Sequence, residues 1–385
     1  MADQKKNQLS YYIPGIVTVL MAMGTVFVFS ASSSITQQIN IKNFYSFQAI
    51  RQIMFFPLAV LIIHTVSCVD YHRVGLTKGW LKSLITYLLP VSIALLIIVL
   101  IPQLGTEINQ ARRWLRIPAG PVSISFQPSE LAKWTLVFFL AAFFDRYQNE
   151  PGYYWKRFIP ICLIISLFIV LILPEDFGTA AFIALLCLLI FLIAGIKLSH
   201  IFTLIPVGVF VFIAVLLRSP SRLKRIAAFL HPEEWASSAA YQANQSLIAL
   251  GSGGLWGKGL GRGTCKYGHL PEDTTDFIFA IIGEEMGLFG TIIIIVLFIT
   301  FIWLGILVVV RCKDRLGQLL AGGIILSIGI QAALNISVVT VVLPTKGISL
   351  PFVSAGGSGL LLSAAAVGVL VNIAKQSPKI TSGES

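Results

Sequence analysis

The sequence predicts an all-α polytopic membrane protein with about ten transmembrane helices. The first observation behind this prediction is composition. Of 385 residues, 56% are hydrophobic and only 12% are charged, whereas an ordinary soluble domain carries about 25% charged residues. The second is that apolar runs recur along the whole chain, many of them near the length of about 20 residues that a helix needs to cross a bilayer. Together these observations exclude a soluble enzyme and a disordered chain.

Ten apolar runs are expected to form these helices, in the order 11–32, 52–69, 82–102, 130–146, 158–174, 177–196, 200–217, 288–310, 318–342 and 359–375. The fourth and fifth runs are among the shortest. Only Pro174, Glu175 and Asp176 separate the fifth run from the sixth, which predicts a tight hairpin at one face of the membrane. No small-residue cleavage site follows the first run, so we expect a retained span rather than a signal peptide.

An even number of spans places both chain ends on one side of the membrane. The distribution of Lys and Arg over the short loops favours the cytoplasm for both. The seventh and eighth helices are then joined by a long extracytoplasmic loop, residues 218–275. We expect residues 1–375 to form a single transmembrane domain and residues 376–385 to form a short polar cytoplasmic tail.

The formal net charge of +11 favours, in a membrane protein, anionic lipid headgroups or phosphorylated lipids, and we expect no nucleic-acid partner. Two cationic groups, Arg112-Arg113 followed by Trp114 and the segment 222–225, lie beside predicted membrane entry points on the outer side. They fit the diphosphate headgroup of an outer-leaflet lipid. A solvated basic loop that reaches phospholipid headgroups is an equal alternative.

Charged residues near the spans provide candidate site residues. Glu130 and Lys133 are three residues apart and therefore share one helical face. They form either an ion pair within the helix or part of a polar cavity along a substrate path. Arg51, Asp176 and Lys346 are expected at the same outer face. Titratable groups that converge at one depth are a better candidate site than any one of them alone.

Asp276 follows the long loop and directly precedes an apolar stretch. A carboxylate at a membrane boundary is costly to desolvate and can serve as a general base. A residue in that place is also a common helix N-cap, and position alone favours the cap. The glycine-rich segment 251–263 either brings backbone close to a ligand or is a flexible loop, and composition alone favours the loop.

A set of long motifs in the chain resembles the signature of the SEDS family (shape, elongation, division and sporulation), which includes FtsW, RodA and SpoVE. The segment 343–358, Leu-Pro-Thr-Lys-Gly-Ile-Ser-Leu-Pro-Phe-Val-Ser-Ala-Gly-Gly-Ser, carries the resemblance with Asn335-Ile336 before it. Further matching blocks, in the expected order, are 109–114, 126–133, 176–179, 241–242, 251–261 and 270–290. The forms of 281–285 and 344–347 resemble the division and sporulation branch, and FtsW in particular, more than the elongation branch.

This resemblance implies a ten-span peptidoglycan glycosyltransferase that polymerises lipid II at the outer face of the bacterial cytoplasmic membrane. The FtsW-like motifs imply septal synthesis during cell division. The implied partners are lipid II, the undecaprenyl diphosphate-linked glycan, a class B penicillin-binding protein of the FtsI type and other divisome membrane proteins. No fixed cofactor is implied, although a divalent cation, Mg²⁺ or Mn²⁺, would assist a diphosphate leaving group.

The resemblance also implies residue roles. The Asp of the family's Thr-Asp-Phe-Ile-Phe block is its catalytic residue, and Asp276 occupies that position. The resemblance therefore favours the base over the helix cap. The expected substrate-binding residues are Arg51, Arg113, Trp114, Glu130, Lys133, Asp176, Lys346 and Ser354. Of these, Arg113, Lys133 and Lys346 are the leading candidates for stabilising charge on the diphosphate.

The chain departs from the family pattern at a few positions. Thr274 stands where the family usually has His two residues before the catalytic Asp, and Pro174 is shifted by one place relative to Asp176. Two other functions fit the same residues. A lipid II flippase would use the intramembrane charges as a headgroup path and would need no base. A non-catalytic division scaffold would only recruit or activate a partner synthase.

Overall fold

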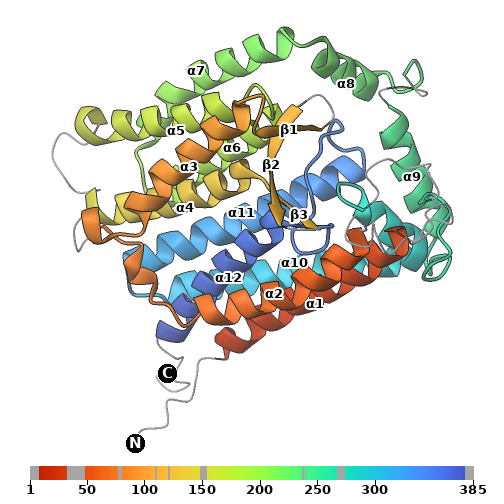
Figure 1. The fold of residues 1–385 in the computed structure, drawn as a ribbon, viewed down its shortest axis with the longest axis horizontal. Coiled ribbons are helices and arrows are strands. Elements are labelled where there is room, and N and C mark those ends of the chain that lie inside the picture. The colour runs from red at the N-terminus through yellow and green to blue at the C-terminus, as the bar shows by residue number, and fades with distance from the viewer. Residues whose placement is uncertain are drawn as a thin grey trace, which may run out of the picture.

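The chain forms a bundle of long helices with a small sheet and two shorter helices gathered at one end (Figure 1). The computed structural model describes residues 8–32, 48–76, 80–108, 111–119, 122–147, 154–235, 238, 240–266 and 274–377. In this part of the chain, α1 begins and α12 ends at the end of the bundle opposite α8 and α9. The arrangement agrees with the even number of spans expected from the sequence.

Ten helices correspond to the ten apolar runs. They are α1 (Leu9–Ser32), α2 (Gln48–Val66), α3 (Ile85–Leu100), α4 (Pro128–Tyr147), α5 (Ile159–Ile172), α6 (Phe177–Ile193), α7 (Leu198–Leu217), α10 (Ile278–Arg311), α11 (Arg315–Val339) and α12 (Ser358–Gln376). Short helical turns lie at Tyr71–Arg73, Trp80–Lys82 and Tyr154–Phe158. Of the expected tail, residues 378–385 lie outside the described residues.

The surface of the bundle is apolar, as a lipid-facing surface must be. Six described helices (α1, α2, α7, α10, α11 and α12) are long and apolar enough to cross a membrane, and α3 and α6 are shorter apolar helices. Along α10, one face exposes large apolar side chains at every third or fourth position. They are Phe289, Ile292, Val296, Ile299, Trp303, Ile306 and Val310. A continuous apolar stripe of this length is stable only against lipid or another apolar helix. The protein is therefore an integral membrane protein.

Three antiparallel strands, which the sequence reading did not anticipate, occupy the connection between α3 and α4. They are β1 (Gly105–Ile108), β2 (Ala111–Ala119) and β3 (Val122–Phe126), in the order β1-β2-β3. Leu115 pairs with Gly105 on one side and with Phe126 on the other. A Cβ on Gly105 would lie 2.0 Å from the carbonyl oxygen of Val99. Only glycine therefore lets the sheet turn back this closely onto the end of α3.

The eighth span begins ten residues earlier than the sequence predicted, at Ile278 rather than 288. Glu284 and Glu285 interrupt the apolar pattern, but both side chains are buried and each is paired with a lysine. The helix α10 is kinked at Gly287, where φ is +67°. The predicted span starts just after this kink.

The long connection between α7 and α10 is partly helical. It contains α8 (Pro220–Leu230) and α9 (Tyr241–Gly253). Near its kink at Gly287, the backbone of α10 is hydrogen-bonded to the glycine-rich segment that follows α9. The backbone N–H groups of Lys258 and Gly259 donate to the carbonyls of Glu284 and Glu285, at 3.0 Å each. A Cβ on Gly287 would lie 2.4 Å from the backbone nitrogen of Gly257. Glycine at the kink thus permits the close backbone pairing that holds the segment on α10.

Candidate functional site

Asp276 lies in a turn whose backbone is fixed by three hydrogen bonds from distant parts of the chain. The carbonyl of Thr274 accepts from the backbone N–H of Ala355 at 2.8 Å. The carbonyl of Thr275 accepts from the Ser354 hydroxyl, and that of Asp276 accepts from the Asn335 side-chain amide at 2.8 Å. Three consecutive carbonyls are therefore anchored, which sets the position of Asp276 before any ligand binds.

The Asp276 carboxylate lies beside Gly347 of the segment 343–358. A Cβ on Gly347 would lie 2.7 Å from Oδ2 of Asp276. The N-cap residue of α10 is Phe277, one position after Asp276. Asp276 is therefore not the N-cap residue. The interpretation of Asp276 as a simple helix cap, which its position alone favoured, is wrong.

The segment 343–358 packs against this turn, and two side-chain amides of α11 donate hydrogen bonds to its backbone. Asn335 donates to the carbonyl of Ile348 at 2.6 Å, and Gln331, one turn earlier, donates to that of Ser349 at 3.0 Å. In the tight turn that follows, the Ser354 hydroxyl accepts from the Leu350 backbone N–H at 2.7 Å. Phe352, in the same turn, has a φ of +64°, which is strained for a bulky residue.

Lys346 extends from this segment to the first turn of α6. Its ammonium donates to the carbonyl of Gly178, close to Asp176. Asp176 caps α6 by accepting from the Thr179 backbone N–H at 2.9 Å, and lies 3.7 Å from the Arg113 guanidinium. Burial lowers the pKa of Lys346 to about 8; Asp176 opposes this shift and Arg113 adds to it. This group of Arg113, Asp176 and Lys346 is called the cation cluster below.

Glu130 and Lys133 form the ion pair expected from their spacing, with Nζ and Oε2 2.7 Å apart. Lys133 is also part of the site: its side chain is 1% exposed and donates to Gln331 at 3.0 Å. Since Gln331 holds the carbonyl of Ser349, the pair supports the segment that carries Lys346. The ion pair expected from the spacing is therefore present, and a substrate path along these residues stays a prediction.

Arg51 and Trp114 also lie at this end of the bundle. Arg51 is half-buried in the first turn of α2, near Gly357. Trp114 is half-buried on β2, opposite Thr106 of β1. The sequence reading missed Arg116, whose positive charge acts on that of Arg51. The two cations come from a strand and a helix that are far apart in the chain, so no local motif indicates their proximity.

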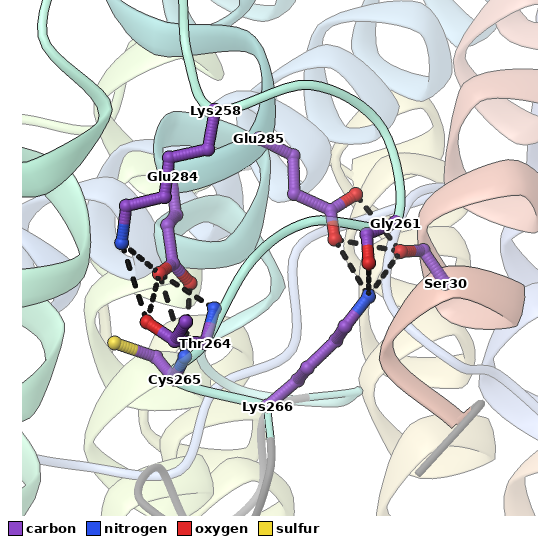
Figure 2. A network of polar contacts seen from close by, with 8 residues as sticks. All are labelled: Ser30, Lys258, Gly261, Thr264, Cys265, Lys266, Glu284 and Glu285. Carbon is purple, nitrogen blue, oxygen red and sulfur yellow. Dashed lines mark hydrogen bonds and ion pairs between the residues drawn. The ribbon is translucent and has the colours of Figure 1, made fainter. Parts of the chain in front are cut away.

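A second polar network, in which the carboxylates of α10 bind the glycine-rich segment, is drawn in Figure 2. Glu284 accepts from the Lys258 ammonium at 2.6 Å and from the Thr264 backbone N–H at 2.8 Å. Glu285 accepts from Lys266 at 3.0 Å and from the Ser30 hydroxyl of α1 at 2.7 Å. Residues 251–266 are thus hydrogen-bonded onto α10 and α1, in contrast to the flexible loop that composition alone favoured.

Breaking the buried Glu285–Lys266 pair on one side is expected to destabilise the protein strongly. The two side chains are 0% and 1% exposed, and removing one partner of a buried ion pair costs about 3–5 kcal/mol. Glu285→Gln should therefore lower the thermal unfolding temperature of the purified protein markedly. Adding Lys266→Met removes the unpaired charge and should restore part of the loss. An unfolding temperature of Glu285→Gln equal to that of the wild type would contradict this assignment.

The described residues contain no group of three or more His, Cys, Asp or Glu side chains that could hold a metal ion. Mg²⁺, however, is usually bound by one or two carboxylates together with substrate phosphates and water. Asp276 could supply one such carboxylate. The divalent cation suggested by the resemblance therefore stays a prediction that depends on the substrate.

Comparison with known proteins agrees with this fold. A family model described as cell cycle protein, FtsW/RodA/SpoVE, matches residues 11–379. Stage V sporulation protein E of Bacillus subtilis is 36% identical, over 97% of this chain and 99% of its own length. A probable peptidoglycan glycosyltransferase FtsW of Coxiella burnetii is 38% identical, over 96% of this chain and 98% of its own.

Two solved structures show the same fold at lower identity. One is a chain in a peptidoglycan synthase complex that coordinates polymerization and crosslinking, with a TM-score of 0.74, 22% identity, and 97% and 98% of the two chains covered. The other is the rod shape determining protein RodA of Thermus thermophilus, with a TM-score of 0.66, 22% identity, and 96% and 97% covered.

Proposed function

This chain belongs to the FtsW/RodA/SpoVE family of cell cycle proteins, and we propose that it is a peptidoglycan glycosyltransferase that polymerises lipid II. The observation that supports this proposal is the position of the Asp276 carboxylate beside Gly347, the residue that follows the half-buried cation Lys346. A base and a cation held in one rigid site are the two groups that glycosyl transfer from a diphosphate needs.

The reaction follows from this arrangement. Asp276 accepts the proton of the GlcNAc 4-hydroxyl of an incoming lipid II. That oxygen attacks C1 of the MurNAc at the reducing end of the growing chain and forms the new glycosidic bond. The bond from C1 to the diphosphate oxygen breaks, and undecaprenyl diphosphate leaves with the electron pair. Lys346 and Arg113 stabilise the negative charge that develops on the departing diphosphate.

The other expected site residues have supporting roles in this proposal. Lys133, whose ammonium is already bound by Glu130 and Gln331, positions the 343–358 segment rather than the diphosphate. Ser354 positions Asp276 through the carbonyl of Thr275. Asp176 orients Arg113 and Lys346. Trp114 supplies an aromatic surface for a sugar.

The family resemblance and the relatives support a particular setting. We place the site at the outer face of the bacterial cytoplasmic membrane, with both chain ends in the cytoplasm and the protein at the division septum. A class B penicillin-binding protein, which crosslinks the polymerised strands, is the proposed partner. The similarity to a chain of a complex that coordinates polymerization and crosslinking supports such a pairing.

A polymerase and a flippase are distinguished by one experiment. The purified chain is reconstituted into vesicles with fluorescent lipid II, and both glycan ladders and exchange of lipid II between leaflets are measured. The proposal expects ladders from wild type and loss of ladders in Asp276→Asn. Exchange between leaflets without ladders, equally fast in Asp276→Asn, would favour the flippase. If Asp276→Ala fully complements a chromosomal deletion, the protein acts as a scaffold.

Gly178→Ala is expected to slow polymerisation while the protein stays folded. A Cβ at this position would lie 1.7 Å from Cε of Lys346, which is the mobile end of a long side chain, so the ammonium moves and the helix does not. Misplacing a catalytic group by about 1 Å can cost about 100-fold in rate. Lipid II turnover and the thermal unfolding temperature are measured together. A wild-type rate in a correctly folded variant would show that Lys346 does not act from this position.

A further inference from the structure

A second set of cationic and polar groups, separate from the cation cluster, meets at the start of α12. Arg51 of α2 lies beside Gly357: a Cβ on this glycine would be 3.6 Å from the Arg51 guanidinium. Arg116 of β2 is close enough for its positive charge to act on Arg51. Among the described residues, neither arginine forms an ion pair with a carboxylate. Two like charges brought together in this way attract an anion.

The backbone at this point adds donors. Gly357 is the N-cap residue of α12 and, as a glycine, has no side chain with which to cap the helix. The first N–H groups of a helix have no partner within the helix, and its N-terminus carries a partial positive charge. The Ser358 hydroxyl already accepts a hydrogen bond from the backbone N–H of Gln127, at 3.0 Å. The Glu130 carboxylate lies near Gly359, but its charge is balanced by Lys133 at 2.7 Å.

Gln52 provides an independent sign that a ligand is missing here. Its side chain is 1% exposed, and Oε1 accepts from the backbone N–H of Gly356 at 3.1 Å. Its Nε2 donor is buried and has no hydrogen-bond partner in the described part of the chain. An unsatisfied buried amide is costly. The same side chain is bound through its oxygen to Gly356, the residue before the glycine beside which Arg51 lies.

We propose that Arg51, Gln52, Arg116 and the N-terminus of α12 form a second oxyanion subsite, which holds the diphosphate of the acceptor lipid II. This proposal rests on the proposed function, because a polymerase must hold two lipid-linked diphosphates at once. The departing diphosphate is bonded to the carbon that reacts. The diphosphate of the acceptor lipid II is separated from the attacking hydroxyl by the whole disaccharide. The cation cluster borders Asp276 through Gly347 and suits the former. The second subsite borders residues that contact the Asp276 turn at Thr274, namely Gln48 and Ala355, and suits the latter.

Binding of a short prenyl diphosphate, geranylgeranyl diphosphate, tests the subsite without requiring catalysis. Calorimetry is performed on the full chain in phosphatidylcholine nanodiscs. The wild type is expected to bind two equivalents. The double variant Arg51→Gln/Arg116→Gln should bind one equivalent, at the cation cluster. Lys346→Gln should also bind one equivalent, at the second subsite. Gln52→Glu keeps the bond to Gly356 but replaces the free donor with a negative oxygen, so it should weaken the second site by about tenfold or more. Arg112→Gln, on the same strand but paired with Glu107, is the matched control.

The outcomes separate the proposals. Two undiminished equivalents in the double variant, or wild-type affinity in Gln52→Glu, would overturn the second subsite. Two equivalents in wild type without any glycan ladder would refute the polymerase and leave the anion site intact. If phosphatidylglycerol in the nanodiscs abolishes the second equivalent in wild type, a phospholipid headgroup is the natural ligand and the acceptor assignment is wrong. In the polymerisation assay, Arg116→Gln should raise KM for lipid II about tenfold with little change in kcat.

Discussion

Asp276→Asn is expected to lower the rate of lipid II polymerisation by about 100- to 10,000-fold, the contribution typical of a general base. The amide has nearly the same shape but cannot accept the proton of the 4-hydroxyl. Steady-state kinetics with purified protein would show the loss in kcat, because the base acts in the transition state. KM for lipid II should change little.

The folded structure should survive this substitution. The turn is anchored through three consecutive backbone carbonyls, by Asn335, Ser354 and Ala355, and an amide at position 276 leaves these three hydrogen bonds unchanged. The thermal unfolding temperature of Asp276→Asn should therefore stay close to that of wild type. A variant that retains more than a tenth of the wild-type rate would show that another group accepts the proton.

Lys346→Gln is expected to have the second largest effect, a loss of about 100- to 1,000-fold, comparable with the removal of one donor from an oxyanion hole. Because the pKa of Lys346 is lowered to about 8, the side chain is charged below this pH and becomes neutral as the pH rises through it. Activity that depends on the charge should therefore fall between pH 7 and pH 9. A pH–rate profile of kcat measures this directly.

Lys346→Arg separates the charge from the side chain that carries it. A guanidinium stays protonated throughout this pH range, so the alkaline decline should disappear even if the longer side chain lowers the rate at pH 7. An alkaline decline that persists in Lys346→Arg would mean that another group titrates. Lys346 would then have no part in the pH dependence.

The helical architecture could be predicted from the sequence because lipid imposes a simple constraint: each span must be apolar and near 20 residues long. The beginning of α10 could not. Glu284 and Glu285 break the apolar pattern, and their partners Lys258 and Lys266 lie in a glycine-rich segment that gives no local sign of pairing. The strands at 105–126 were not predicted, because a search for long apolar runs detects membrane-spanning helices and not short strands.

The candidate site shows the same limit. The chemical types at Asp276 and Lys346 pointed to a site, but position alone favoured a cap for Asp276. The contacts that build the site are long-range: Ser354 holds Thr275, 79 residues away, and Lys346 reaches Gly178, 168 residues away. Such contacts follow from the packing of α6, α10 and α11, which local periodicity does not determine. The resemblance to a family supplied what the pattern could not.

The most direct test is polymerisation of labelled lipid II by the purified chain, alone and with a class B penicillin-binding protein. Moenomycin and a β-lactam are present to suppress contaminating synthases, and products are separated by length. We expect glycan ladders from wild type and none from Asp276→Ala under the same conditions. The absence of ladders from folded wild-type protein with and without the partner, or equal ladders from Asp276→Ala, would contradict a polymerase that works through Asp276.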